Sequence, residues 1–262
     1  MDNFCKIRRK GFTLVELLIA MAVGIVIIAA VYSAMNLALR FSANTDRKVI
    51  TQQDTRAVLD LMAMEIRMAS YNPLITTNTW SSASPLACMP SLAVAPIIYK
   101  GIKNANANTI AIAMDLNNDG VIGCSCGTCC GPPNTCTNNT CAGTNEYIVY
   151  SYDGVNTLNR SVSCVGADIL GGSAPFTNVR NNPPELPAAI PLFRYFDKNN
   201  LEITNTVNNN ASLVNGIPAI RSIQITIVAD TAANDTTQSG IPRPRRMIYS
   251  TSVIVRNHAL SP

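Results

Sequence analysis

A single carboxylate interrupts the long apolar run near the start of the chain. Between Phe12 and Leu39, Glu16 is the only side chain that carries a charge at neutral pH. An unpaired carboxylate in a membrane span is costly, so such a residue is by default a candidate functional site. The chemistry that Glu16 offers is pairing with a cation. The basic residues at positions 6–10 should hold that end of the span in the cytoplasm and the rest of the chain outside.

The residues around Glu16 also form a recognisable junction. Lys10-Gly11-Phe12-Thr13-Leu14-Val15-Glu16 resembles the class III signal of type IV prepilins and of type II secretion pseudopilins. Such leaders are short and basic, end in Gly, and are cut before a Phe that becomes N-methylated, and the fifth residue of the retained hydrophobic stretch is Glu. The resemblance implies that prepilin peptidase removes residues 1–11 by cutting between Gly11 and Phe12. It also implies that Phe12 is N-methylated and that Glu16 pairs with the Phe12 amine of an adjacent subunit.

Two simpler interpretations of this junction are an ordinary secretory signal and a plain membrane anchor. A secretory signal has an apolar region of about 7–15 residues and a small-residue cleavage site at its far end. The run here has 28 residues, contains Glu16, and has its Gly at the near end. The prepilin interpretation therefore fits better.

Loss of the leader changes the charge of the chain. Four of its 20 basic residues and one of its 16 acidic residues lie in residues 1–11, so the remainder is close to neutral. We find no basic stripe interleaved with aromatic residues, and the sequence gives no indication of a nucleic-acid partner.

Removal of the leader also removes Cys5 and leaves an even number of cysteines. An even count in an oxidising compartment favours disulfides. Six of the eight fall in a Gly-, Pro- and Asn-rich stretch, and we predict a disulfide-rich insertion over residues 117–145. A redox pair at Cys126 and Cys129 and a thiolate metal site are the alternatives. The eight residues are Cys88, Cys124, Cys126, Cys129, Cys130, Cys136, Cys141 and Cys164.

A second candidate metal site lies just before this insertion. Asp115, Asn117 and Asp119, followed by Gly120, match the opening of a calcium-binding loop. The usual closing Glu is replaced by Cys126, and a polar turn explains the same residues. The sequence predicts no cofactor, with calcium as the alternative at this loop.

The elements that position these residues begin with a long helix. We predict helix over residues 12–71, with 12–39 forming the membrane-spanning or filament-core part. Its second half carries an apolar stripe formed by Val58, Met62, Ile66 and Ala69 and widened by Leu61, Met64 and Met68. Such a stripe is typical of a helix that packs on a sheet. Tyr71-Asn72-Pro73 indicates where the helix ends.

For the remainder, residues 72–262, we predict a β-rich globular head. The predicted strands are Ala93–Tyr99, Thr109–Asp115, Glu146–Tyr152, Pro191–Phe196, Ile220–Ala229 and Met247–Arg256. Turns are expected at Asp153-Gly154 and over residues 197–200. Ile223, Ile225 and Ile227 alternate with other residues, which predicts one buried face. The expected fold is α+β and pilin-like: a long N-terminal helix packed on an antiparallel sheet with a cysteine-rich loop insertion.

Later segments narrow the resemblance. The sequences over residues 57–71, 192–197, 221–226 and 251–257 are similar to those of the PilW minor pilin family, which is related to the J-type minor pseudopilin of type II secretion. The resemblance implies a structural subunit that helps to initiate pilus assembly near the filament tip. Tip subunits of this kind often lack the Glu, so the presence of Glu16 implies another subunit above this one.

Several expectations follow for partners and location. The implied partners are other minor and major pilins, prepilin peptidase, the inner-membrane assembly platform, and membrane lipid through residues 12–39. The chain should cross the bacterial inner membrane once, with its head in the periplasm, and later reach the pilus or cell surface. We find no catalytic motif and expect no enzyme activity. A type II secretion pseudopilin and a filament-displayed adhesin remain the alternatives.

Overall fold

The computed structural model describes most of the helix and much of the head. The described residues are 11–73, 100–116, 118, 122, 146–162, 165–167, 169, 176–177, 179–182, 188–207, 214–236 and 242–259. For residues 165–167, 231–236, 242–245 and 259 the description covers the backbone alone. The predicted strand Ala93–Tyr99 and most of the predicted insertion over residues 117–145 lie outside it.

A 55-residue helix, α1, runs from Leu14 to Met68. The chain forms two compact units, one ending at Val49 and the other beginning at Ile50, so the helix contributes to both. The helix ends three residues earlier than predicted. Ser70 adopts the left-handed conformation, with φ at 66°, and its backbone N–H donates to Ala113 O at 3.0 Å instead of continuing the helix.

The first sheet is an antiparallel meander with the strand order β1-β2-β3-β4-β5. Its strands are β1 (Ile102–Ala105), β2 (Thr109–Ala113), β3 (Tyr147–Tyr152), β4 (Thr157–Val162) and β5 (Val165–Ala167), and the short β6 (Phe176–Thr177) also pairs with β4. The β3–β4 hairpin turns at Asp153-Gly154 as predicted, and Gly154 has a φ of 82° that only glycine adopts readily.

The second sheet has the order β7-β8-β9 and is also antiparallel. Strand β7 (Phe193–Phe196) pairs with the first residues of β8 (Ser222–Thr236), and β8 pairs along its whole length with β9 (Pro242–Ile254). Short helical elements complete the head: α3 (Thr204–Val207), η1 (Ile217–Ala219) and α4 (Arg256–Ala259). The turn predicted over residues 197–200 is present, with Asn200 at a φ of 60°.

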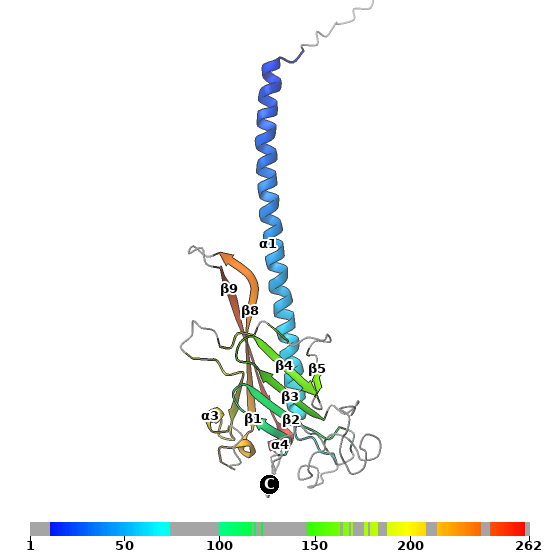
Figure 1. Cartoon of the computed structure of the whole chain (residues 1–262), viewed down its shortest axis with the longest axis vertical. Coiled ribbons are helices and arrows are strands. Elements are labelled where there is room, and N and C mark those ends of the chain that lie inside the picture. The colour runs from blue at the N-terminus through cyan, green and yellow to red at the C-terminus, as the bar shows by residue number, and fades with distance from the viewer. Residues whose placement is uncertain are drawn as a thin grey trace, which may run out of the picture. The chain divides into compact units, whose positions relative to one another are not determined.

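The C-terminal part of α1 packs with residues of both sheets in one core (Figure 1). Val58, Met62, Ile66 and Ala69 are fully buried, which confirms the predicted stripe. Met64 is 54% exposed, so its place in the stripe was predicted wrongly. Leu59 and Ala63 are buried instead, because the core that α1 shares with both sheets covers a wider arc of the helix than the predicted stripe.

The strands of the head also differ in part from their predictions. Ile223, Ile225 and Ile227 are all buried, as their alternation predicts. Thr226 and Val228 are nearly as buried, so the expectation of a single buried face is wrong for this part of β8. Strands β1, β4, β5 and β6 were not predicted. The sequence of β4, Thr-Leu-Asn-Arg-Ser-Val, is mostly polar and does not look like a strand. Its Arg160 can be buried there only because Glu65 pairs with it in the folded head.

Gly101 is required by a close approach of two backbones. A Cβ atom added there would lie 2.0 Å from Ser70 N. Ser70 Oγ accepts a hydrogen bond from Gly101 N at 2.9 Å. The end of α1 is therefore fixed against the start of the first sheet.

Candidate functional site

The candidate site lies at the first turn of α1. The helix begins at Leu14, which makes Thr13 the N-cap and Glu16 the third helical residue. Thr13 N donates to Glu16 Oε2 at 2.9 Å, and Glu16 N donates to Thr13 Oγ1 at 3.2 Å. The Thr13 hydroxyl also donates to Glu16 Oε2 at 3.1 Å. This reciprocal pattern is a capping box, which satisfies two backbone donors that the helix start leaves free.

Both hydrogen bonds to the Glu16 carboxylate fall on the same oxygen atom, Oε2. Within the described part of the chain, the contacts of Glu16 come from Thr13 alone and from no cation. Glu16 can therefore keep its cap and still accept a hydrogen bond from a cationic group of another molecule through Oε1. The charged acceptor makes such a bond stronger than one between neutral groups.

The surroundings of the site are apolar and have no cover from the chain itself. Phe12 is 90% exposed, and large apolar side chains from Leu14 to Leu39 are more than half exposed. One helix among the described residues, α1, is long and apolar enough to cross a bilayer. An apolar face of this size in water is unfavourable, so the segment requires lipid or other subunits around it.

Thr13 is the one functional residue at this site that our sequence analysis did not single out. The signal was present, since a Thr followed three residues later by Glu just before an apolar run is a capping-box pattern. From the sequence, Glu16 was predicted only to form an intersubunit pair, whereas the structure gives this residue a role within its own chain as well.

Comparison with known families identifies the same segment. Residues 6–32 match the family described as the prokaryotic N-terminal methylation motif. The chain carries the N-terminal motif of pilin-type proteins. The match includes Gly11, Phe12 and Glu16, and it supports a type IV pilin or pseudopilin. Neither the curated proteins nor the solved structures contain a significant match to the chain.

The other predicted site residues lie mostly outside the described part of the chain. This is true of all eight cysteines, of Asn117 and of Asp119. Asp115 is described and buried, and its Oδ1 accepts a hydrogen bond from Asn118 N at 2.7 Å. This contact is the local turn bond that a polar turn predicts. The described residues contain no cluster of three or more metal-ligating side chains.

A buried ion pair joins α1 to the first sheet. Oε2 of Glu65, on α1, accepts a hydrogen bond from Arg160 Nε at 3.2 Å. The other carboxylate oxygen, Glu65 Oε1, forms an ion pair with Arg160 Nη2. The Tyr150 hydroxyl also donates to Glu65 Oε2. Burial and the adjacent Glu65 carboxylate raise the pKa of Tyr150, so this tyrosine stays neutral and acts as a donor. The group fixes the rotation and register of the helix on the sheet.

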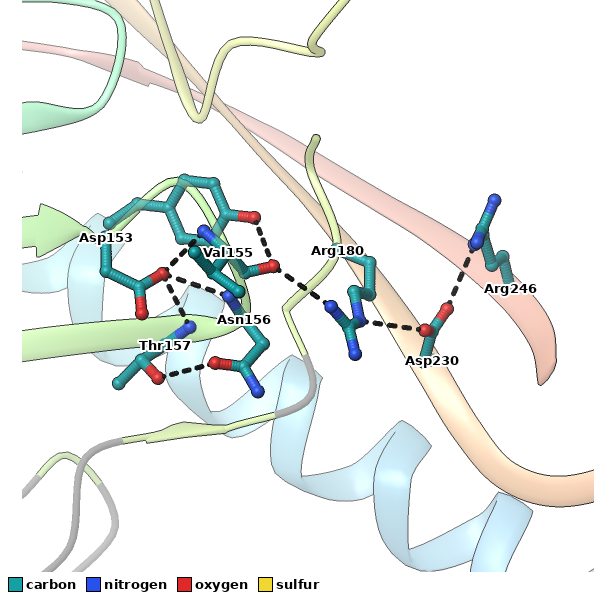
Figure 2. A network of polar contacts seen from close by, with 8 residues as sticks. Asp153, Val155, Asn156, Thr157, Arg180, Asp230 and Arg246 are labelled. Carbon is teal, nitrogen blue, oxygen red and sulfur yellow. Dashed lines mark hydrogen bonds and ion pairs between the residues drawn. The ribbon is translucent and has the colours of Figure 1, made fainter. Parts of the chain in front are cut away.

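A second polar group links the two sheets (Figure 2). The Asp153 carboxylate accepts hydrogen bonds from three successive backbone N–H groups at the β3–β4 turn, at 2.8–3.0 Å. Arg180 Nη1 donates to Val155 O in this turn at 3.4 Å, and its Nε pairs with Asp230 on β8 at 3.2 Å. Arg246 Nε on β9 donates to the other oxygen of Asp230 at 3.1 Å. One carboxylate on β8 is therefore shared by two guanidinium groups.

His258 closes the head near the end of α1. Its Nε2 lies 2.9 Å from Ile217 O, and since a carbonyl only accepts, Nε2 carries the proton. Nδ1 then accepts from the Ser70 hydroxyl at 3.3 Å. Burial, with smaller contributions from Lys100 and Arg221, lowers the pKa of His258 to about 4. The only histidine of the chain is thus a neutral structural group in the described head.

Proposed function

We propose that this chain is a minor pilin of the PilW type, a structural subunit that helps to initiate type IV pilus assembly near the filament tip. The observation that carries the proposal is the position of Glu16, fifth in the retained segment of the methylation motif, on a helix whose apolar face has no cover within its own unit. The similarity of later segments to the PilW family supports the finer assignment.

The proposed mechanism starts in the inner membrane. Prepilin peptidase removes residues 1–11 and the new amine of Phe12 is methylated, while the head stays in the periplasm. The carboxylate of Glu16 then pairs with the Phe12 amine of an adjacent subunit. An unpaired carboxylate in a membrane is costly, up to roughly 3 kcal/mol at the centre on insertion scales, so correct pairing favours one register of the helices over others.

The capping box, which we did not predict from the sequence, orients the Glu16 carboxylate. Glu16 Oε2 is held by Thr13 in the single chain, so the direction of the carboxylate is set before a neighbour arrives. Less side-chain freedom is then lost on pairing. In this proposal the chain is a substrate of prepilin peptidase and has no catalytic role of its own.

Substitution of Glu16 tests the proposal directly. We expect Glu16→Leu to be cleaved and inserted normally but to be lost or strongly reduced in sheared filaments. Asp60→Leu is the matched control, because Asp60 is an exposed carboxylate of the same helix within the head unit. Normal recovery of the Glu16→Leu chain in sheared filaments would overturn the pairing. Intact mass spectrometry without reduction should show loss of residues 1–11, one added methyl group, and eight hydrogens missing through four disulfides.

A minor pseudopilin of a type II secretion system is the second candidate, because its leader carries the same signal. An adhesin role is a third, and the cysteine-rich sequence favours it. Deletion of residues 120–143 separates structure from adhesion. Loss of filaments would favour the structural role, whereas normal filaments with lost attachment would favour the adhesin. Secretion and piliation assays in one deletion strain separate pilus from pseudopilus.

A further inference from the structure

The β8–β9 hairpin continues well beyond the sheet to which it belongs. Strand β7 pairs only with Ser222–Ile225 of β8, and Val179 forms a bridge with Ala229. Beyond that point, residues 230–236 of β8 pair only with residues 242–246 of β9 among the described strands. We call the paired residues 230–236 and 242–246 the arm. A two-stranded ribbon is marginally stable by itself in water, so the arm is expected to have a partner surface.

The base of the arm is fixed by charge. Asp230 lies at the point where the ribbon leaves the sheet. Its Oδ1 lies 3.1 Å from Arg246 Nε and its Oδ2 lies 3.2 Å from Arg180 Nε (Figure 2). Arg180 in turn contacts the β3–β4 turn through Val155 O. These contacts orient the start of the arm relative to both sheets.

The arm carries an excess of positive charge on one strand. Its β9 strand contains Arg243, Arg245 and Arg246, and its β8 strand contains Asp230 and Asp235. The register places Arg243 opposite Asp235 and Arg246 opposite Asp230, but Arg245 is opposite Thr231. Since Asp230 is also shared with Arg180, two guanidinium groups are in excess over the carboxylates. The complementary surface is therefore anionic.

Two prolines disfavour another strand as the partner of the arm. Pro242 and Pro244 lie on β9 within the arm and have no backbone N–H to donate. Proline and basic residues are features that prevent strand addition at a sheet edge. A partner recognised through guanidinium groups rather than through backbone hydrogen bonds fits this strand, and carboxylate and phosphate are the groups that guanidinium binds in a bidentate manner.

The direction of β9 indicates where such phosphates are found. Met247 Sδ accepts a hydrogen bond from Gln52 Nε2 at 3.2 Å, whereas His258, four residues after β9, contacts Ser70. Strand β9 therefore runs in the same direction as the helical segment Ile50–Met68 of its unit. From Met247 back toward its first residue, β9 leads past Gln52 toward the N-terminal end of this helical segment. That end is the one nearest in sequence to the apolar run. Only ten residues separate Leu39 from Ile50, which is a short tether between the head and a bilayer.

We propose that the arm docks on anionic phospholipid headgroups before the subunit enters a filament. The proposal rests on the membrane anchoring that is part of the proposed function. A few arginines are a weak membrane signal in a free protein. In an anchored chain the short tether keeps the arm at a high effective concentration near the headgroups, so a weak attraction is sufficient. Docking would hold the head in one orientation until assembly pulls it from the bilayer.

Hydrogen exchange on the full chain in vesicles tests the arm. The chain is reconstituted into phosphatidylcholine alone and into phosphatidylcholine mixed with phosphatidylglycerol. We expect the amides of residues 231–236 and of Arg243, Arg245 and Arg246 to exchange roughly three- to tenfold more slowly with the anionic lipid, and this difference to disappear at high salt. The exposed turn over residues 197–200, which contains Lys198, serves as the internal reference and should not change.

Matched variants separate the arm from general charge effects. Arg243→Gln with Arg245→Gln should abolish the slowing, whereas Arg56→Gln with Arg67→Gln, an equal loss of charge on the exposed face of α1, should retain it. Equal exchange of the arm in both lipids would overturn the proposal. The role of the arginines would then be to prevent other strands from pairing with the edge of β9. Equal slowing by glycerol phosphate in solution would overturn the lipid as partner. A chain that does not float with either vesicle would instead contradict the membrane anchoring, and with it the proposed function.

Discussion

Two glutamates of α1 show how differently one helix uses the same side chain. Glu65 is buried and receives Arg160 and Tyr150 from the first sheet. Glu16 is exposed, and its contacts come from Thr13 of its own turn. Glu65 therefore has its cation within the chain, whereas Glu16 has a cap and no cation in the part that the structure describes.

The residues around the two glutamates differ in the same way. The apolar side chains near Glu65 are buried in a core shared with both sheets, and those near Glu16 are exposed. The first set stabilises the folded head, and the second set can be buried only by lipid or by other subunits. The comparison implies that substitutions near Glu65 affect stability and that substitutions near Glu16 affect insertion and assembly.

The largest effect expected from this comparison is that of one substitution made in both parts of the helix. Ile66→Asp places a carboxylate in the fully buried core and should destabilise the head by at least about 4 kcal/mol. Ile27→Asp, at a residue that is 56% exposed, should leave the melting temperature of the head unchanged and reduce membrane insertion. Thermal unfolding in detergent and membrane fractionation measure the two effects. A comparable loss of head stability in both variants would show that the two parts are not energetically separate.

The next largest effect concerns the buried ion pair. Glu65→Met leaves Arg160 without its carboxylate at a site where the arginine side chain is 11% exposed, and it should cost roughly 3–5 kcal/mol. Chemical denaturation of the purified chain measures the loss. The double variant Glu65→Met with Arg160→Met should recover most of the stability, because it leaves no buried charge. Glu16→Gln is the contrasting control and should leave head stability unaltered. A double variant as unstable as the single one would mean that the pair itself, rather than the orphaned arginine, dominates.

A pH dependence of intermediate size is expected from His258. Its pKa is about 4 in the folded head and near 6.5 in the unfolded chain, so the unfolded state binds more protons between these values. The contribution of neutral His258 to the free energy of unfolding should be fully present above about pH 6.5, fall as the pH drops toward 4, and be lost below that. The loss is on the order of 3 kcal/mol.

Denaturation across this pH range, compared between the wild type and His258→Gln, isolates the histidine. The glutamine amide can still donate to Ile217 O and accept from Ser70, but it does not titrate in this range. An identical pH slope in both proteins would assign the acid sensitivity to other groups. This prediction sharpens the comparison, because the acid response should be confined to the head and should not alter the first turn of α1.

The smallest effect is expected at the capping box. Thr13→Val removes the hydroxyl that bonds Glu16 N and Glu16 Oε2, and it should weaken the first turn by about 1 kcal/mol. Hydrogen exchange of the first-turn amides in detergent measures this loss, with Thr13→Ser as the variant that retains the cap. Unchanged protection in Thr13→Val would show that the surrounding apolar medium, rather than the cap, holds the turn.

The helix and its functional residues could be predicted from the sequence because their signals are local. The apolar run, Glu16 within it, and the stripe from Val58 to Ala69 each depend on residues a few positions apart. Strand β4 could not be predicted in this way. From the sequence alone Arg160 is expected at the surface, and only the packing of α1 places Glu65 next to it. Met64 was placed wrongly because periodicity gives the centre of a helix face but not the width that the neighbouring strands cover.

The sequence by itself determined that this chain has an N-terminal methylation motif, a long apolar segment that begins at Phe12 and a carboxylate at the fifth position of that segment. These features are recognised by residue type and order, and they remain the same in any fold. The tertiary structure decided which polar groups are satisfied within the chain. It paired Glu65 with Arg160, enclosed His258 against Ser70, and extended β8 and β9 into a basic arm. Such contacts join residues tens to hundreds of positions apart, and only packing brings them within hydrogen-bond distance.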